Sequence, residues 1–133
     1  MYILHKPQYP EHDAKCKKLT EESEIRFAGI IDKDGVIVAG GFKKGLIPLE
    51  KDELKLEEFV EFVYKVSQRK SFDDELGPIN YLAARRDKIV LISFPLTDLA
   101  LLISAEHAID IEKLARHIVS VFGSEHSRFS DGT

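Results

Sequence analysis

The sequence has 133 residues, of which 44% are hydrophobic and 32% are charged, and its formal net charge is −4. This length suits one domain of ordinary size, and the apolar content is high enough to build a core, which excludes a wholly disordered chain. The acidic total argues against general nucleic-acid binding, because such proteins usually present a basic face to phosphate.

The single cysteine, Cys16, leaves no disulfide within the chain, which is typical of a reducing interior. The apolar runs 89–92 and 99–103 are too short to span a membrane, and the N-terminus lacks the apolar stretch of a signal peptide. We therefore expect a cytoplasmic protein without membrane insertion. We expect one domain over residues 1–133, with an ordered core at about 13–122 and a frayed tail at 124–133.

The first predicted element is a helix within residues 11–24. This stretch is polar, with Ala14, Cys16 and Leu19 as its apolar members. Pro10 could begin the helix, because proline suits the first helical position. Such a helix would be mostly solvated.

The stretch IIDKDGVIVAGG places two β-rich runs on either side of an Asp-Gly pair. Asp32 and Asp34 can accept hydrogen bonds from turn amides, and Gly35 can take the positive φ that such turns require. The pattern predicts a β-hairpin. We interpret its carboxylates as turn residues rather than as a ligand site.

A long helix is predicted over residues 52–70, and its apolar side chains form two faces. One face has the spacing of an amphipathic helix that packs on a sheet; it consists of Phe59, Phe62, Val63 and Val66. A neighbouring face, rotated by about 100–140°, carries Val60, Tyr64 and Ser67. A helix that is apolar on two sides is either deeply buried or docks on a second partner.

Strand-like runs follow at residues 79–85, 88–94 and 99–104. Their short connections predict antiparallel pairing as a meander. Residues 89–92 and 99–103 are apolar at every position. A strand that is apolar on both sides needs cover on both faces of its sheet.

Residues 110–122 give the clearest helix, with Asp110 as N-cap and Gly123 placed to end it. The predicted order is α-β-β-α-β-β-β-α. One five-stranded antiparallel sheet with helices on both faces satisfies every periodicity, which is an α+β architecture.

No motif in the sequence supports catalysis, since it contains no P-loop, no GxSxG elbow and no HExxH group. Cys16 lies between lysines, which could lower its pKa, although a half-buried helix residue is the preferred interpretation. The acidic residues 73–75 lack the alternating ligands of a calcium loop. Residues 85–86, both arginine, could recognise an acidic partner or mark a charged hairpin tip. We predict a non-enzymatic protein without metal or cofactor.

The element order and the hairpin FAGIIDKDGVIVAGG resemble the Roadblock (dynein light chain) family of the profilin-like and longin-like group. The resemblance covers residues 13–122 and rests on topology and on Asp32, Asp34 and Gly35. The first helix departs from the family, because its apolar stripe is poor. The segment LGPINYLAARRDKIVLISFPLTDLALLISAE is also similar to an uncharacterised archaeal family with the same element order.

Roadblock proteins are usually dimers in which the long central helix and the strand after it join two sheets into one. The resemblance implicates Val60, Tyr64, Ser67 and Tyr81 in a homodimer interface. Family members lack catalytic residues and act as adaptors or regulators of small Ras-like GTPases. The resemblance therefore implies a non-enzymatic dimeric interaction module that could regulate such a GTPase.

The alternative is a small-molecule sensor of the PAS or GAF type. A PAS sheet has a similar hairpin, helical crossover and meander. It usually has several short helices around a ligand cavity, in the interval that one long helix fills here.

Overall fold

The computed structural model describes residues 9–68 and 70–123. Its elements are, in chain order, α1 (Pro10–Thr20), β1 (Ile25–Ile31), β2 (Ile37–Phe42), α2 (Glu53–Ser67), α3 (Asp73–Leu76), β3 (Leu82–Arg85), β4 (Ile89–Pro95), β5 (Ala100–Glu106) and α4 (Ile111–Phe122). The one-turn helix α3 is added to the predicted order, and the predicted α+β class is confirmed. The tail predicted to be frayed, 124–133, lies outside the described residues.

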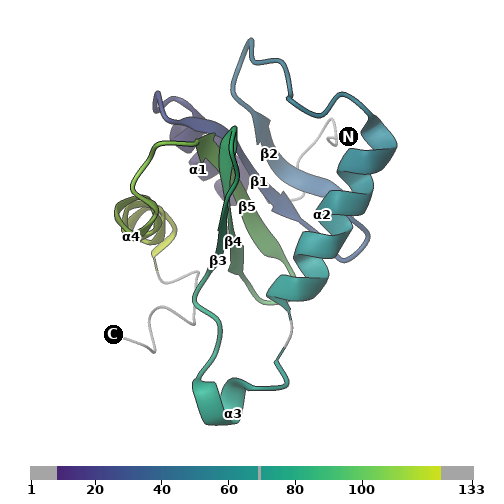
Figure 1. The fold of residues 1–133 in the computed structure, drawn as a ribbon, viewed down its shortest axis with the longest axis vertical. Coiled ribbons are helices and arrows are strands. Elements are labelled where there is room, and N and C mark those ends of the chain that lie inside the picture. Colours follow the sequence, from purple (N-terminus) through teal and green to yellow (C-terminus); the bar gives the residue numbers. More distant parts are fainter. Residues whose placement is uncertain (1–8, 69, 124–133) are drawn as a thin grey trace.

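The five strands form one antiparallel sheet in the order β2-β1-β5-β4-β3. β2 and β3 are therefore its edges. Helices α1 and α4 cover one face of the sheet, and α2 lies on the other (Figure 1). The predicted need for cover on both faces is met by these three helices.

The turn between β1 and β2 is built as predicted. The Asp32 Oδ1 atom accepts hydrogen bonds from the amides of Asp34, at 2.9 Å, and Val36, at 3.0 Å. Gly35 has a φ of 78°, which favours glycine. The Asp32 carboxylate is therefore occupied by its own turn.

Helix α1 is largely solvated, as predicted, yet it packs on the sheet. Its buried residues are Asp13, Cys16 and Leu19, and the helix contacts both β1 and β2. The Asp13 Oδ1 atom accepts a hydrogen bond from the Gly40 amide of β2 at 2.8 Å. A buried carboxylate thus supplies attachment that the short apolar stripe lacks.

Gly40 allows this close approach of helix and sheet. Its φ is +74°, and a Cβ atom there would lie 2.1 Å from the Ala28 carbonyl oxygen and 2.7 Å from the Cys16 Cβ. Both the backbone conformation and the contact distance therefore require glycine.

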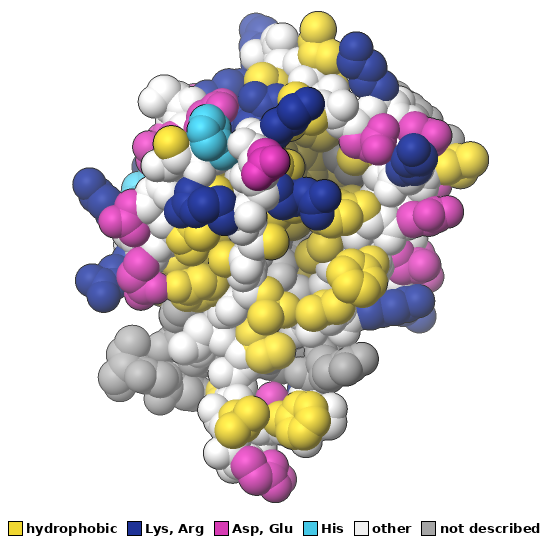
Figure 2. All heavy atoms as spheres, in the orientation of Figure 1, with side chains coloured by type: hydrophobic (Ala, Val, Ile, Leu, Met, Phe, Trp, Pro, Cys, Tyr) yellow, Lys and Arg dark blue, Asp and Glu magenta, His cyan; other side chains and the backbone are white. Residues whose placement is uncertain are grey.

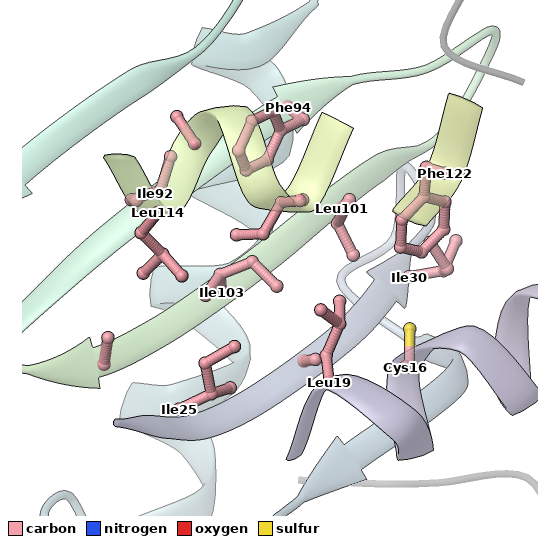
Figure 3. Close-up of a cluster of buried hydrophobic side chains, with 14 of the residues drawn as sticks. Cys16, Leu19, Ile25, Ile30, Ile92, Phe94, Leu101, Ile103, Leu114 and Phe122 are labelled. Atoms are coloured by element: carbon pink, nitrogen blue, oxygen red, sulfur yellow. The ribbon is translucent and has the colours of Figure 1, made fainter. Parts of the chain in front are cut away.

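Two hydrophobic clusters lie on opposite faces of the sheet. Figure 3 shows the larger one, in which side chains from α1, α4 and the strands meet, among them Cys16, Ile103 and Phe122. The smaller cluster lies between α2 and the sheet. Its buried members are Phe27, Ile31, Ile37, Val60, Ala100 and Leu102.

We expect Gly40→Ala to lower the free energy of unfolding by about 3 kcal/mol or more, because it combines positive-φ strain with a backbone clash. Urea denaturation measures the loss. Gly45→Ala is the matched control, since Gly45 has a φ of +80° but nothing within 4 Å of its Cβ position. The control should cost about 1 kcal/mol, and equal losses would contradict the packing argument.

The pKa of Asp13 is lowered from its ordinary value of 3.8: burial raises it, but the Gly40 hydrogen bond and the Lys17 ammonium outweigh burial. The unfolded chain therefore binds this proton more readily. The stabilising contribution is complete above the unfolded pKa and is lost as pH falls through the folded one. We expect Asp13→Asn to cost about 1 kcal/mol at pH 7. Urea denaturation should show this difference shrinking as pH falls below the ordinary carboxyl pKa of 3.8, and a constant difference would contradict the assignment.

Candidate functional site

The side of α2 that faces the sheet differs from the prediction. The stripe against the sheet contains Val60, Val63, Tyr64 and Ser67, and the exposed fractions of Val60 and Ser67 are 1% and 0%. Phe62, expected to pack on the sheet, is 62% exposed. Phe59 and Val63 of the predicted stripe do pack on the smaller cluster. The prediction is therefore wrong for Phe62, and Val60 and Ser67 of the second face are buried in its place.

The physical reason lies at the C-terminal end of α2, where the helix approaches β4 closely. The Ser67 hydroxyl donates a hydrogen bond to the Ser93 hydroxyl at 2.7 Å, and both serines are buried. A small polar residue fits this contact and finds a partner there, whereas a phenylalanine is too large. Ser67 sets the rotation of α2 and turns Phe62 outward.

The two tyrosines named by the prediction lie on opposite faces of the sheet. The hydroxyl of Tyr64 donates to the Asp98 carbonyl at 3.0 Å, in the turn between β4 and β5. Tyr81 packs on Phe94 and donates to the Glu112 carboxylate of α4. The structure thus brings Val60, Tyr64 and Ser67 together against their own sheet and separates Tyr81 from them. A dimer contact of these four residues stays a prediction.

Helix α2 covers only part of its face of the sheet. The strand register places Leu82 and Ala84 of β3 beside Ser93 and Leu91 of β4, on the side that faces α2. Leu82 and Leu91 are only half-buried, and Ala84 is exposed. An apolar strip therefore remains without full cover between α2 and the β3 edge.

A groove of about 560 Å³ lies where this strip meets the β3–β4 turn, between that turn and the first half of α2. Figure 2 shows this hollowed face with hydrophobic side chains gathered over it. The groove contains apolar groups from the sheet and from α2, among them Phe27, Phe42, Phe59, Phe62, Leu91 and Leu102. Its charged members are Arg26, Glu50, Lys55, Glu58 and Arg86.

The large hydrophobic side chains that are more than half exposed come from α2, the loop before it and the segment around α3. They are Ile47, Leu49, Leu54, Phe62, Phe72 and Leu76. Exposed apolar groups gathered on one face commonly mark an interaction surface. The sequence prediction missed Phe72 and Leu76, although their spacing of four residues within an acidic stretch was a usable signal.

Other candidate groups have structural roles. Burial raises the pKa of the Cys16 thiol to about 12, and the nearby Asp13 charge adds to the effect, so the thiol stays protonated and unreactive at neutral pH. The Arg85 guanidinium donates to the carbonyls of His107 and Ile109. Within residues 9–68 and 70–123, no three acidic, histidine or cysteine side chains gather as a metal site.

Within the same two described segments, no helix has the length and apolarity needed to cross a membrane.

The fold is that of the Roadblock class, which confirms the resemblance noted in the sequence. The Roadblock/LC7 domain from Streptomyces avermitilis gives a TM-score of 0.60 at 15% identity, covering 84% of this chain and 92% of that one. MglB of Myxococcus xanthus gives 0.65 at 12% identity, covering 98% and 96%. The gliding protein MglB from Thermus thermophilus gives 0.62 at 14% identity, covering 94% and 95%.

By sequence, the chain belongs to DUF6659, a family of unknown function whose model matches residues 6–132. Comparison with curated proteins found no match. The structural neighbours show the fold, and the description of the family states no function.

The observed rotation of α2 predicts different costs for truncating its two faces. Val60→Ala should lower the free energy of unfolding by about 2 kcal/mol, because it removes buried methyl groups and leaves a cavity. Phe62→Ala should change it by less than about 0.5 kcal/mol at a concentration where the chain is monomeric. Urea denaturation of both variants measures this, and a larger loss for Phe62→Ala would contradict the observed rotation.

Proposed function

We propose that this chain is a non-enzymatic interaction module that forms a homodimer through the β3 edge and the α2 face of its sheet. The dimer would bind and regulate a small Ras-like GTPase. The observation that carries the proposal is a partly uncovered apolar sheet face beside a free edge strand.

The β3 edge is suited to pairing with a second chain. Among the described strands, β3 bonds only to β4, and Ala83, Ala84 and Arg85 are exposed. An edge strand presents unpaired amides and carbonyls that can accept another strand. Antiparallel pairing of two β3 strands would join the two sheets into one.

The same pairing would also cover the apolar strip. The second copy's α2 would lie over Leu82, Ala84 and Leu91, next to the exposed Phe62 of the first α2. Burial of these groups supplies a hydrophobic gain that strand pairing alone lacks. One MglB structure, 12% identical and with the same fold, is described as a tetrameric arrangement, so the fold is compatible with self-association.

The GTPase part of the proposal rests on the resemblance to Roadblock proteins.

A PAS-type or GAF-type sensor is the weaker alternative. In the layer between sheet and helix, Val60 and Val63 of α2 pack on the hydrophobic cluster of Phe27 and Leu102. The groove lies at the margin of this packed layer and faces solvent (Figure 2), which suits a protein partner.

We expect the wild-type chain to sediment as a dimer at high micromolar concentration, and Phe62→Glu to shift it towards monomer. The substitution would place a carboxylate in an apolar contact, where an unpaired charge is costly. Ser120→Glu is the matched control, because exposed Ser120 lies on α4, on the far side of the sheet. Sedimentation velocity over a concentration series distinguishes the variants, and a wild type that remains monomeric would contradict the dimer.

The same two variants test the partner. Purified small Ras-like GTPases from the source organism, loaded with GDP or a non-hydrolysable GTP analogue, are titrated with each chain by calorimetry. We expect one nucleotide state to bind more tightly, with binding lost in Phe62→Glu and kept in Ser120→Glu. No binding by any of these GTPases would contradict this part of the proposal and leave the dimer standing.

A further inference from the structure

The segment around α3 forms an exposed apolar and acidic knob, defined as residues 72–76. Phe72 is 61% and Leu76 is 79% exposed, and residues four apart lie on one side of a helical turn. Three acidic residues, 73–75, lie between them. Figure 1 shows α3 projecting beyond the end of the sheet, and Figure 2 shows hydrophobic and acidic side chains together on this projection.

The knob and the groove lie at opposite ends of the same elements. The knob follows the C-terminal end of α2 and precedes the start of β3. The groove is lined by Lys55, Phe59 and Phe62 of the first half of α2, and by Arg86, which follows the last residue of β3. A single chain therefore cannot bring its own knob to its own groove without unfolding the intervening strand or helix.

A two-fold axis through paired β3 strands would bring them together. Antiparallel pairing sets the start of one strand against the end of the other, and it reverses the direction of the second α2. The second copy's knob is thereby carried to the end where the first copy's groove opens. Because a two-fold contact is isologous, the same contact would form twice.

The chemistry of the two surfaces is complementary. The apolar groups of the groove, such as Phe42 and Leu102, suit Phe72 and Leu76. Among the charged residues of the groove, Arg26 is already paired with Glu106 at 3.4 Å. Lys55 lies beside Glu50 and Glu58 in the sequence, and Arg86 belongs to the turn after β3, whereas the knob is acidic. Glu58 belongs to α2 and Glu50 to the loop before it, and both would repel the carboxylates of the knob. The side of the groove formed by the β3–β4 turn, with Arg86, is therefore the favourable side for them.

The connection between the knob and β3 is long enough to let the knob extend towards a second chain. Residues 77–81 form neither helix nor strand, and an extended chain spans about 3.3–3.6 Å per residue. Gly77 has a φ of +82° and nothing within 4 Å of its Cβ position, so open space surrounds this point of the connection.

We propose that the knob of one copy docks in the groove of a second copy, with Phe72 and Leu76 against the apolar floor and the acidic residues towards Arg86. Two such contacts clamp the dimer at both ends of the paired β3 strands. This docking rests on the proposed homodimer and adds to it a contact made by the residues around α3.

The first test replaces the apolar groups of the knob. The double variant Phe72→Ser/Leu76→Ser should raise the dimer dissociation constant at least about tenfold, measured by sedimentation equilibrium. Its thermal unfolding as a monomer should match the wild type, because both side chains are exposed. Asn80→Ala, an exposed residue of the same connection, is the matched control and should leave the dissociation constant unchanged.

The second test locates the contact. One preparation carries Leu76→Cys in the knob and the other carries Leu49→Cys, since Leu49 lines the groove and is 53% exposed. Mild oxidation of the mixture should give a disulfide-linked heterodimer, whereas Cys16 should not react because it is buried. Leu76→Cys mixed with Lys113→Cys, on the far face, should give no heterodimer above background. Equal yields from the two mixtures would overturn the docking.

A variant of the β3 edge tests the dimer separately from the docking of the knob. Ala84→Glu alters the β3 edge outside the groove and should dissociate the dimer on its own. If Ala84→Glu does so while Phe72→Ser/Leu76→Ser dimerises like the wild type, the dimer stands and the docking is overturned. If the wild type is monomeric at every concentration, both are overturned.

Discussion

A sheet that is apolar on both faces must be covered on both, and this chain places one long helix on the second face. Helices α1 and α4 close the larger core cluster, which includes Ile92, Ile103 and Phe122. Of the helices in residues 9–68 and 70–123, α2 alone packs on the smaller cluster, and the strip near β3 stays partly open. The candidate interaction surface is therefore an apolar strip that the described helices leave partly uncovered, and burial of such a strip by a partner is favourable.

The position of α2 decides where that surface opens. Its C-terminal end is held near the sheet by polar contacts. Ser67 bonds Ser93, and the Gln68 side-chain amide donates to the carbonyls of Leu96, at 3.2 Å, and Leu99, at 2.6 Å. The first half of the helix instead lines the groove. Because a helix is rigid, these contacts at the C-terminal end of α2 also help to set the distance between its first half and the sheet, where the groove lies.

Features set by local chemistry could be predicted from the sequence, whereas features set by contacts between distant residues could not. The β1–β2 turn and the α4 caps depend on neighbours such as Asp32 and Asp110, whose side chains bond nearby amides. The attachment of α1 depends on Asp13 meeting Gly40, which lies 27 residues away. The rotation of α2 was ambiguous because two stripes satisfied the same period, and the hydroxyl that decides between them has its partner on β4. The groove follows from that rotation and leaves no pattern of its own.

The two edges of the sheet differ in how they can take part in assembly. At the β2 edge the Gly40 amide is bonded to Asp13, α1 packs against the strand, and the positive φ of Gly40 departs from regular strand geometry. At the β3 edge the strand is regular, its two central residues are alanines, and Arg85 anchors it to the carbonyls before α4. A sheet with two open edges can grow without limit, whereas a sheet with one usable edge closes after a single pairing. The contact between Asp13 and Gly40 therefore attaches α1 to the β2 edge, and in the proposed dimer it would leave β3 as the edge for pairing, which favours a closed pair over a fibre.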